Sequence, residues 1–455
     1  MNTIIKTSVR RLLAFLLIVA ALPPSAFGAA KILNLPYREE RLPNGLRIFM
    51  VKYPSSGTVS FQIPVHAGSR NEVEKGKTGF AHFFEHLMFR GTKNMSGKDF
   101  GELYAKLGAE NNVWMWLDMT NYHGVVASVY LPKILEAEAD RFANLFFDEK
   151  ALRDEAGAVM GEYNKSVARP EFLLDEKLVA TAFKVHPYGH TTMGYKEDVW
   201  KFTERYKDVW PFFQQYYRPS NISIVLVGDV DFDQNLAFIR EKFGGWKDPE
   251  MKPVTIPQEP KQTAPRSAEV RLNKPTQTRV VVAYKVPAFS TKNTDSAALE
   301  LIAEMAFSVT SEFQKTYRFE KKWLDSVDAG ALQTVDPGLW QVSLRLSQAG
   351  EAHQKEIVKA VESTIVQLRS APPSLERLIA TKTRFQNAAV TSWFSSPEQL
   401  AGRIAWYTNF EPDLDVINRI FERLEEVTPE VILDYAKRHL IDSGKTTVQL
   451  KGSKA

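Results

Sequence analysis

A proline-rich segment near the middle of the chain constrains the fold more than any other feature. Between residues 248 and 269 the chain carries Pro253, Pro257, Pro260 and Pro265 with few apolar anchors, which is typical of an extended linker crossing a surface. On either side lie parts of about two hundred residues, each long enough to bury its own core. We therefore expect two halves, residues 31–248 and 269–455, joined by a linker over residues 249–268.

Both parts show the same order of predicted elements. In the first, alternating residues over 46–51 and 59–66 predict paired strands, and a β-branched run over 222–227 predicts a returning strand. The helical patterns between them cover residues 79–89, 100–107, 131–147, 150–167 and 172–183.

The second part repeats this order of strands, helices and strand. Strand patterns cover residues 279–286, 340–346 and 446–450, with a helix over 295–306 and helices through most of 351–439. Two parts with the same element order suggest an internal duplication.

The composition excludes several classes of protein. With 44% apolar, 25% charged and 11% aromatic residues, the chain is globular rather than collagen-like, coiled-coil or largely disordered. The 58 basic and 54 acidic residues nearly balance and form no basic block, so a nucleic-acid partner has little electrostatic support. Because the chain has no cysteine, any bound metal must use His, Asp or Glu.

The N-terminus has the pattern of an export signal. Lys6, Arg10 and Arg11 precede an apolar run over residues 12–22, which prolines and small residues follow. An N-terminal membrane anchor is the alternative, but this run is shorter than the roughly twenty apolar residues that span a bilayer. We expect residues 1–28 to be a signal peptide that directs the chain to the periplasm. Whether the signal is cleaved or retained as an anchor stays open.

The strongest chemical motif is His82-Phe83-Phe84-Glu85-His86, which lies within a predicted helix. Positions i and i+4 lie on one face of a helix, so the imidazoles of His82 and His86 can reach a single zinc ion. Glu85 lies on the same side, close enough to take a proton from a water at the metal. This order, H-x-x-E-H, is that of the inverted zincins. The alternative is a solvated or core-satisfied cluster on a helix face.

A catalytic zinc ion usually takes three protein ligands, so a third is expected on another element. Glu155 and Glu162 are seven residues apart in one predicted helix and lie on nearly the same face. One could bind the metal while the other accepts a ring N–H from a ligating histidine. Spacing alone does not decide between these roles, and glutamates two turns apart are also common on exposed helix faces.

Two segments around the motif resemble a family signature. They are residues 67–72 (AGSRNE) and 79–92 (GFAHFFEHLMFRGT). They resemble the pitrilysin or insulinase superfamily of zinc metallopeptidases, especially its short branch, which includes the mitochondrial processing peptidase. The resemblance covers most of the chain after the expected signal. It implies an α+β fold of two homologous halves, each a mostly antiparallel sheet packed against helices, in a clam-shell arrangement around a chamber.

The resemblance also implies a role for each motif residue. By position, Glu162 matches the family's third metal ligand and Glu155 the glutamate that hydrogen-bonds a ligating histidine. One Zn²⁺ per chain would then be bound by His82, His86 and Glu162, with Glu85 as the general base of peptide hydrolysis.

A further match concerns substrate binding in the first half. Asn112 and residues 118–122 resemble the family's segment leading into an edge strand, on which a peptide is held extended by β-addition. Asn112 would then help to fix the substrate backbone, although it could equally be a turn asparagine. The neighbouring Val113-Trp114-Met115 replaces the small and hydroxyl residues usual there, so no cleavage specificity is predicted.

The second half departs from the family pattern. Self-sufficient members carry an arginine and a tyrosine seven residues apart that bind substrate and stabilise the transition state. Here Arg318 matches, but Asp325 stands in the tyrosine's place. The chain thus resembles the metal-bearing subunit of two-subunit bacterial members, in which a homologous partner without zinc supplies the missing residues. We expect a heterodimer; the alternatives are a homodimer that works without the tyrosine and, for Arg318, a surface ion pair.

Taken together, these features predict a zinc metalloendopeptidase that hydrolyses extended peptides or unfolded segments outside the cytoplasm. Two alternatives remain: a non-catalytic scaffold subunit, and a protein that binds peptides without cleaving them. Neither the substrate nor the partner's identity follows from the sequence.

Overall fold

The structure is a computed structural model that describes residues 31–453. The predicted signal peptide, residues 1–28, lies outside the described residues. By its internal contacts the chain divides into two units, with the boundary in the sequence between Asn34 and Leu35. Every element discussed below belongs to the second unit. Among the described helices, none has the length and apolar character needed to cross a membrane.

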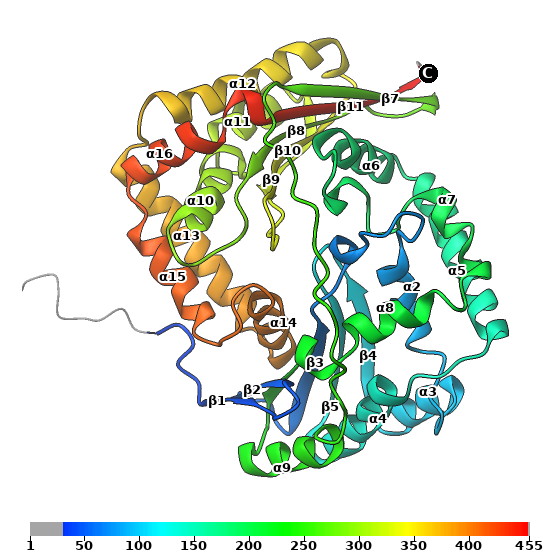
Figure 1. Ribbon diagram of the computed structural model, residues 1–455. Helices are drawn as coiled ribbons and strands as arrows, with labels where there is room; N and C mark the ends of the chain where they lie inside the picture. The colour runs from blue at the N-terminus through cyan, green and yellow to red at the C-terminus, as the bar shows by residue number, and fades with distance from the viewer. Residues whose placement is uncertain (1–30, 454–455) are drawn as a thin grey trace, which may run out of the picture. The chain divides into compact units, whose positions relative to one another are not determined.

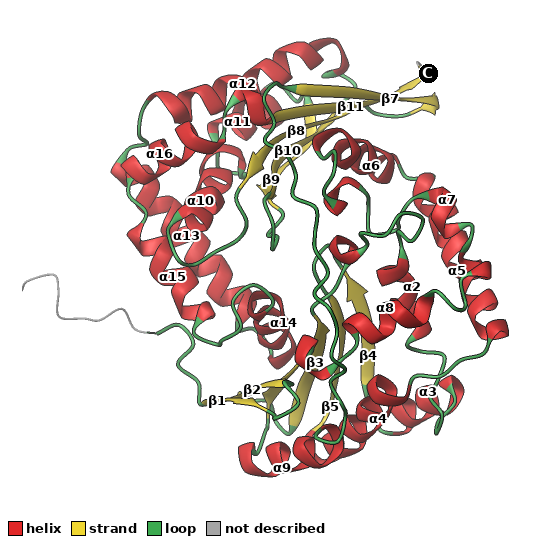
Figure 2. Cartoon of the chain, viewed as in Figure 1, coloured by secondary structure: helices red, strands yellow, loops and turns green. Residues whose placement is uncertain are grey.

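A six-stranded sheet forms the centre of the first half (Figures 1 and 2). Its order is β1-β2-β6-β3-β5-β4, and the β2–β6 pair is parallel while the other pairs are antiparallel. Every residue of β6 is buried, as expected for a central strand covered on both faces. Strand β4 lies at the edge. The strands are β1 (Tyr37–Arg41), β2 (Arg47–Lys52), β3 (Thr58–Val65), β4 (Glu110–Met115), β5 (Thr120–Ala127) and β6 (Ser223–Gly228).

The second half contains a five-stranded sheet with the order β7-β11-β8-β10-β9. Its β7–β11 pair is parallel and the others are antiparallel, which repeats the pairing of β2-β6-β3-β5-β4. The strands are β7 (Arg266–Pro275), β8 (Arg279–Val286), β9 (Leu324–Ala331), β10 (Gly338–Leu346) and β11 (Lys445–Ser453). The predicted α+β fold, with two sheets packed against helices, is confirmed.

Helices cover both sheets. Those of the first half are α2 (Phe80–Leu87), α3 (Gly97–Lys106), α4 (Leu131–Asn144), α5 (Glu149–Val167), α6 (Pro170–Ala182), α7 (Lys196–Val199), α8 (Val209–Tyr216) and α9 (Phe232–Phe243). Those of the second are α10 (Asp295–Phe307), α11 (Glu312–Gln314), α12 (Gln354–Ser370), α13 (Leu375–Trp393), α14 (Pro397–Thr408), α15 (Val416–Glu426) and α16 (Pro429–His439). Each half has its own large apolar core between sheet and helices.

The two halves exchange one helix each. Helix α6 of the first half packs on β7 and β11 of the second sheet, while α14 of the second half packs on β3 and β6 of the first (Figure 1). Leu174 and Leu178 of α6 share an apolar cluster with Val448 of β11. Beside α14, His66 Nδ1 lies 2.8 Å from Asn409 Oδ1. These contacts hold the two halves together.

The proline-rich segment has no helix or strand over residues 246–265. Strand β7 begins at Arg266, so its first three residues fall inside the predicted linker of residues 249–268. Its alternating apolar residues, Ala268, Val270 and Leu272, pack against the apolar cluster that includes residues of α6. The segment is also anchored, because Glu259 accepts hydrogen bonds from the backbone N–H groups of residues 184–186. Gln262 is buried and donates to the Lys445 carbonyl.

Candidate metal centre

Helix α2 places His82, Glu85 and His86 together. It begins after Gly79, whose φ of 89° lies in the left-handed region that glycine adopts readily. A Cβ atom at this position would also clash with the Met193 carbonyl oxygen. The buried rings of Phe80, Phe83 and Phe84 fix one face of the helix in the core. The two imidazole rings are then 4.9 Å apart, centroid to centroid.

The N-terminus of α2 is held by Glu72, for which no role was expected from the sequence. The fully buried carboxylate of Glu72 accepts hydrogen bonds from the N–H groups of Gly79 and Ala81, both at 2.7 Å. Burial raises the pKa of Glu72 to about 8, against the opposing effect of these hydrogen bonds. Glu72 lies seven residues ahead of Gly79, outside any local capping pattern, so its contact with the helix could not be predicted.

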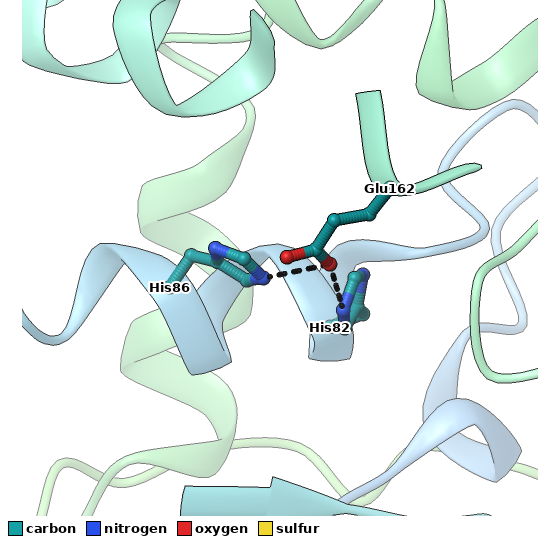
Figure 3. A group of neighbouring side chains, drawn as sticks. All are labelled: His82, His86 and Glu162. Atoms are coloured by element: carbon teal, nitrogen blue, oxygen red, sulfur yellow. Dashed lines mark ion pairs between the residues drawn. The ribbon is translucent and has the colours of Figure 1, made fainter. Parts of the chain in front are cut away.

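Helix α5 supplies the two glutamates. Its N-terminus is capped by Asp148, whose side chain accepts from the Ala151 N–H. Glu162 Oε2 lies 3.5 Å from His82 Nε2 and 3.4 Å from His86 Nε2 (Figure 3). One ligand atom from each of these three residues falls within 4.8 Å of the others, so the group could hold a metal ion.

This geometry fits zinc. Ligand atoms around a tetrahedral zinc ion lie about 3.3 Å apart, given bonds of about 2.0–2.1 Å, and the separations of Glu162 Oε2 from the two imidazole nitrogens, 3.4 and 3.5 Å, are close to that spacing. Two imidazoles and one carboxylate also form a ligand set found in catalytic zinc sites, which leave a position for water.

Glu155 lies on the other side of His86. Its Oε1 is 2.8 Å from His86 Nδ1, and because a carboxylate only accepts, this hydrogen bond places the ring proton on Nδ1 and leaves Nε2 free to bind a metal. Glu155 is buried and also forms an ion pair with Arg90. His82 has no equivalent support, because its buried Nδ1 has no hydrogen-bond partner in the described part of the chain.

Glu85 is half-buried beside the three candidate ligands. Burial raises its pKa above the ordinary value and the Glu162 carboxylate acts in the same direction, while His82 and His86 oppose the shift. A raised carboxylate pKa suits a group that takes up and returns a proton near neutral pH.

Asn112 and Arg318 do not join this cluster through any contact in the described structure. Asn112 is exposed on the edge strand β4, and its Oδ1 accepts from the Val113 N–H. Arg318 donates to Gln314 Oε1 at 2.8 Å within its own helical turn. Asp325 lies on β9 and accepts from Gln277. The substrate-binding roles of Asn112 and Arg318 stay predictions.

Comparisons with known proteins identify the family. Residues 47–196 match the model described as insulinase, peptidase family M16, and residues 204–385 match the peptidase M16 inactive domain. The chain belongs to peptidase family M16. This confirms the predicted superfamily. All four residues of the H-x-x-E-H and Glu162 set lie within the first match, so the description "inactive domain" concerns a segment without them.

Two M16 relatives show how far the likeness extends. Zinc protease PqqE of Helicobacter pylori is 28% identical over 425 residues, covering 92% of this chain and 93% of that protein. Mitochondrial-processing peptidase subunit beta of Bos taurus is 32% identical over 219 residues, covering 48% of this chain and 44% of that protein.

Solved structures of M16 proteins share the fold. A protease from Helicobacter pylori has a TM-score of 0.84 at 27% identity and covers 92% of this chain and 100% of its own. The periplasmic protease PqqL from Escherichia coli has a TM-score of 0.74 at 18% identity over 92% of this chain and 48% of its own, a likeness of fold alone.

Proposed function

We propose that this chain is a zinc-dependent endopeptidase whose metal is bound by His82, His86 and Glu162. The observation that carries the proposal is that Glu162 Oε2 lies 3.5 Å from His82 Nε2 and 3.4 Å from His86 Nε2, close to the spacing of ligands on a tetrahedral zinc ion. One ligand atom from each of the three residues lies within 4.8 Å of the others. Membership of M16 and the names of its zinc protease relatives support the same metal and the same class of reaction.

Glu85 and Glu155 have different roles in the proposed hydrolysis. A bound zinc ion supplies a Lewis acid that polarises the scissile carbonyl and lowers the pKa of the attacking water. Glu85 takes the proton from that water and later delivers it to the leaving amine. Glu155 keeps the His86 ring oriented, with its proton on Nδ1.

The edge of the first sheet is the proposed place for the substrate. Strand β4 ends the sheet, so its outer backbone groups are free to pair with an extended peptide. Helix α2 packs against β4, which brings this edge to the helix of the metal site. Asn112, exposed on β4, would hold the peptide backbone.

The compartment and the partner form part of the proposal. The N-terminal pattern of residues 1–28 supports export to the periplasm. Because Asp325 replaces the expected tyrosine, we infer that a homologous subunit without zinc completes the site in a heterodimer, or that a homodimer works without the tyrosine. Arg318 would contribute to substrate binding in either assembly.

The test of this function is hydrolysis of a mixed peptide library by the purified mature chain, read by mass spectrometry. New termini that disappear with a chelator and return with zinc are expected. If zinc-loaded protein is silent both alone and with a homologue carrying the arginine–tyrosine pair, the enzyme proposal fails, and a scaffold or peptide-binding role takes its place.

The contact between Glu155 and His86 gives a quantitative prediction. Glu155→Ala is expected to weaken zinc binding by about 10–100-fold, because an outer hydrogen bond of this kind orients a metal ligand. Competition with a chromophoric chelator measures the affinity. Arg153→Ala, an exposed change on the same helix, is the control. If Glu155→Ala binds zinc with unchanged affinity, Glu155 does not support the metal site.

A further inference from the structure

A cavity of about 440 Å³ lies where the end of strand β4 meets the second half. Trp116, the residue after β4, contributes from the first half, and helices α10, α13, α14 and α15 contribute from the second. The volume lies within the range of small-ligand pockets. Its lining includes the aromatic side chains Trp116, Phe289, Phe385, Trp393, Trp406 and Tyr407.

The polar groups at one side of the cavity bond to each other. Trp406 Nε1 donates to Gln333 Oε1 at 2.6 Å, and Gln333 Nε2 donates to Glu300 at 3.3 Å. The same amide nitrogen lies 3.5 Å from the Tyr407 hydroxyl. Gln333 therefore already has hydrogen-bond partners within the cavity wall.

The charges in the cavity disfavour a basic ligand. Arg403 and Arg423 both line it, and the Arg403 guanidinium lies over the Trp393 ring, 5.6 Å from its centroid. Glu300 is the one acidic residue among the lining residues. Burial raises its pKa, which favours the uncharged acid and weakens its attraction for a cation.

The cavity lies at the end of β4, the edge strand to which a peptide would be added. Trp114 and Trp116 are two residues apart and so lie on one face of the β4 segment, and the Trp114 ring packs 5.9 Å from that of Trp406 on α14. The turn after β4 is joined to the second half, because the Val335 N–H donates to Asp118 Oδ2 at 3.1 Å. A peptide added to this edge would place alternate side chains on the face that carries Trp114 and Trp116, and Trp116 lines the cavity.

We propose that this cavity is a specificity pocket that receives an aromatic side chain of the bound peptide. The inference rests on the proposed peptidase function and deepens it, by naming peptides with a phenylalanine, tyrosine or tryptophan as the preferred substrates. It also gives a role to Trp114 and its neighbours, which depart from the family's usual small residues.

Binding to zinc-loaded Glu85→Gln protein tests the pocket without hydrolysis. The probes are fluorescein-labelled peptides of alanine, serine and threonine that differ only in one central residue: phenylalanine, lysine, glutamate or alanine. Fluorescence anisotropy should show the phenylalanine peptide binding at least tenfold more tightly than the alanine peptide, a difference of about 1.4 kcal/mol. The lysine peptide should bind no better than the alanine peptide, and the glutamate peptide should bind less tightly than the phenylalanine peptide.

Two variants locate the effect. Trp116→Ala, a change at a partly exposed side chain, and Ala297→Leu, which narrows the cavity from α10, should each reduce the phenylalanine preference at least threefold. Phe146→Ala, an exposed aromatic away from the cavity, should leave it unchanged. Thermal unfolding of each variant checks that the fold persists.

Three results would contradict the proposed specificity pocket. They are equal binding of the phenylalanine and alanine peptides, tighter binding of the lysine or glutamate peptide than of the phenylalanine peptide, and a phenylalanine preference that is unchanged in both variants. The outcome is separable from that of the proposed function. A phenylalanine preference without hydrolysis by the wild-type chain, either alone or with the homologue carrying the arginine–tyrosine pair, would contradict the enzyme alone. Hydrolysis without the preference would contradict the pocket alone.

Discussion

Glu85→Gln should abolish peptide hydrolysis while leaving zinc bound. The substitution keeps the size of the side chain but removes the carboxylate that takes the proton from the attacking water. General-base catalysis contributes about 10²–10⁴-fold to a rate, so kcat/KM is expected to fall by about 10³-fold. The rate is measured on a peptide identified from the library, with the zinc content of the same sample measured by mass spectrometry.

The control for Glu85→Gln is Glu102→Gln, the same chemical change at an exposed residue of α3 that pairs with Lys98 and Lys106. It should keep the wild-type rate. If Glu85→Gln retains more than a tenth of the wild-type kcat/KM with zinc bound, Glu85 is not the base, and the mechanism proposed for α2 is wrong.

Glu162→Ala should lose the metal. The side chain is about half exposed, so its removal should not disturb the core, yet it takes away one of three protein ligands. We expect a loss of zinc affinity of more than about 100-fold, larger than the effect of an outer hydrogen bond. Equilibrium dialysis against buffered zinc gives the affinity, and hydrolysis should fall in parallel.

His82→Ala and His86→Ala should lose the metal in the same way. Asn164→Ala, an exposed change two residues beyond Glu162 on α5, is the matched control and should bind zinc as the wild type does. If Glu162→Ala binds zinc with unchanged affinity, the third ligand lies elsewhere and the assignment of the site is wrong.

The parts of the site within single helices could be predicted because helix periodicity is local. The four-residue spacing of His82 and His86 places both rings on one face, and the seven-residue spacing of Glu155 and Glu162 does the same for α5. Spacing could not tell which glutamate meets His86 Nδ1 and which meets both Nε2 atoms. That depends on how α5 packs against α2, and in the structure Glu155 makes the first contact and Glu162 the second.

The features that the sequence did not reveal depend on contacts between distant residues. The exchange of α6 and α14 between the halves follows from the packing of two sheets, and neither helix carries a local signal for it. Strand β7 pairs in parallel with β11, far along the chain, and this pairing sets its start at Arg266, three residues inside the predicted linker. The cavity beside Trp116 likewise needs both halves in place.

The most direct test of the account is a zinc titration of metal-depleted protein with hydrolysis of a library-derived peptide as the readout. The account predicts that the rate rises in proportion to added zinc up to one equivalent per chain and then levels off, or begins to fall as excess metal inhibits. Glu85→Gln should bind the same equivalent without hydrolysis. Full hydrolysis by the metal-depleted protein, or a rate indifferent to zinc that the protein demonstrably binds, would contradict the claim that His82, His86 and Glu162 form the metal site of a peptidase.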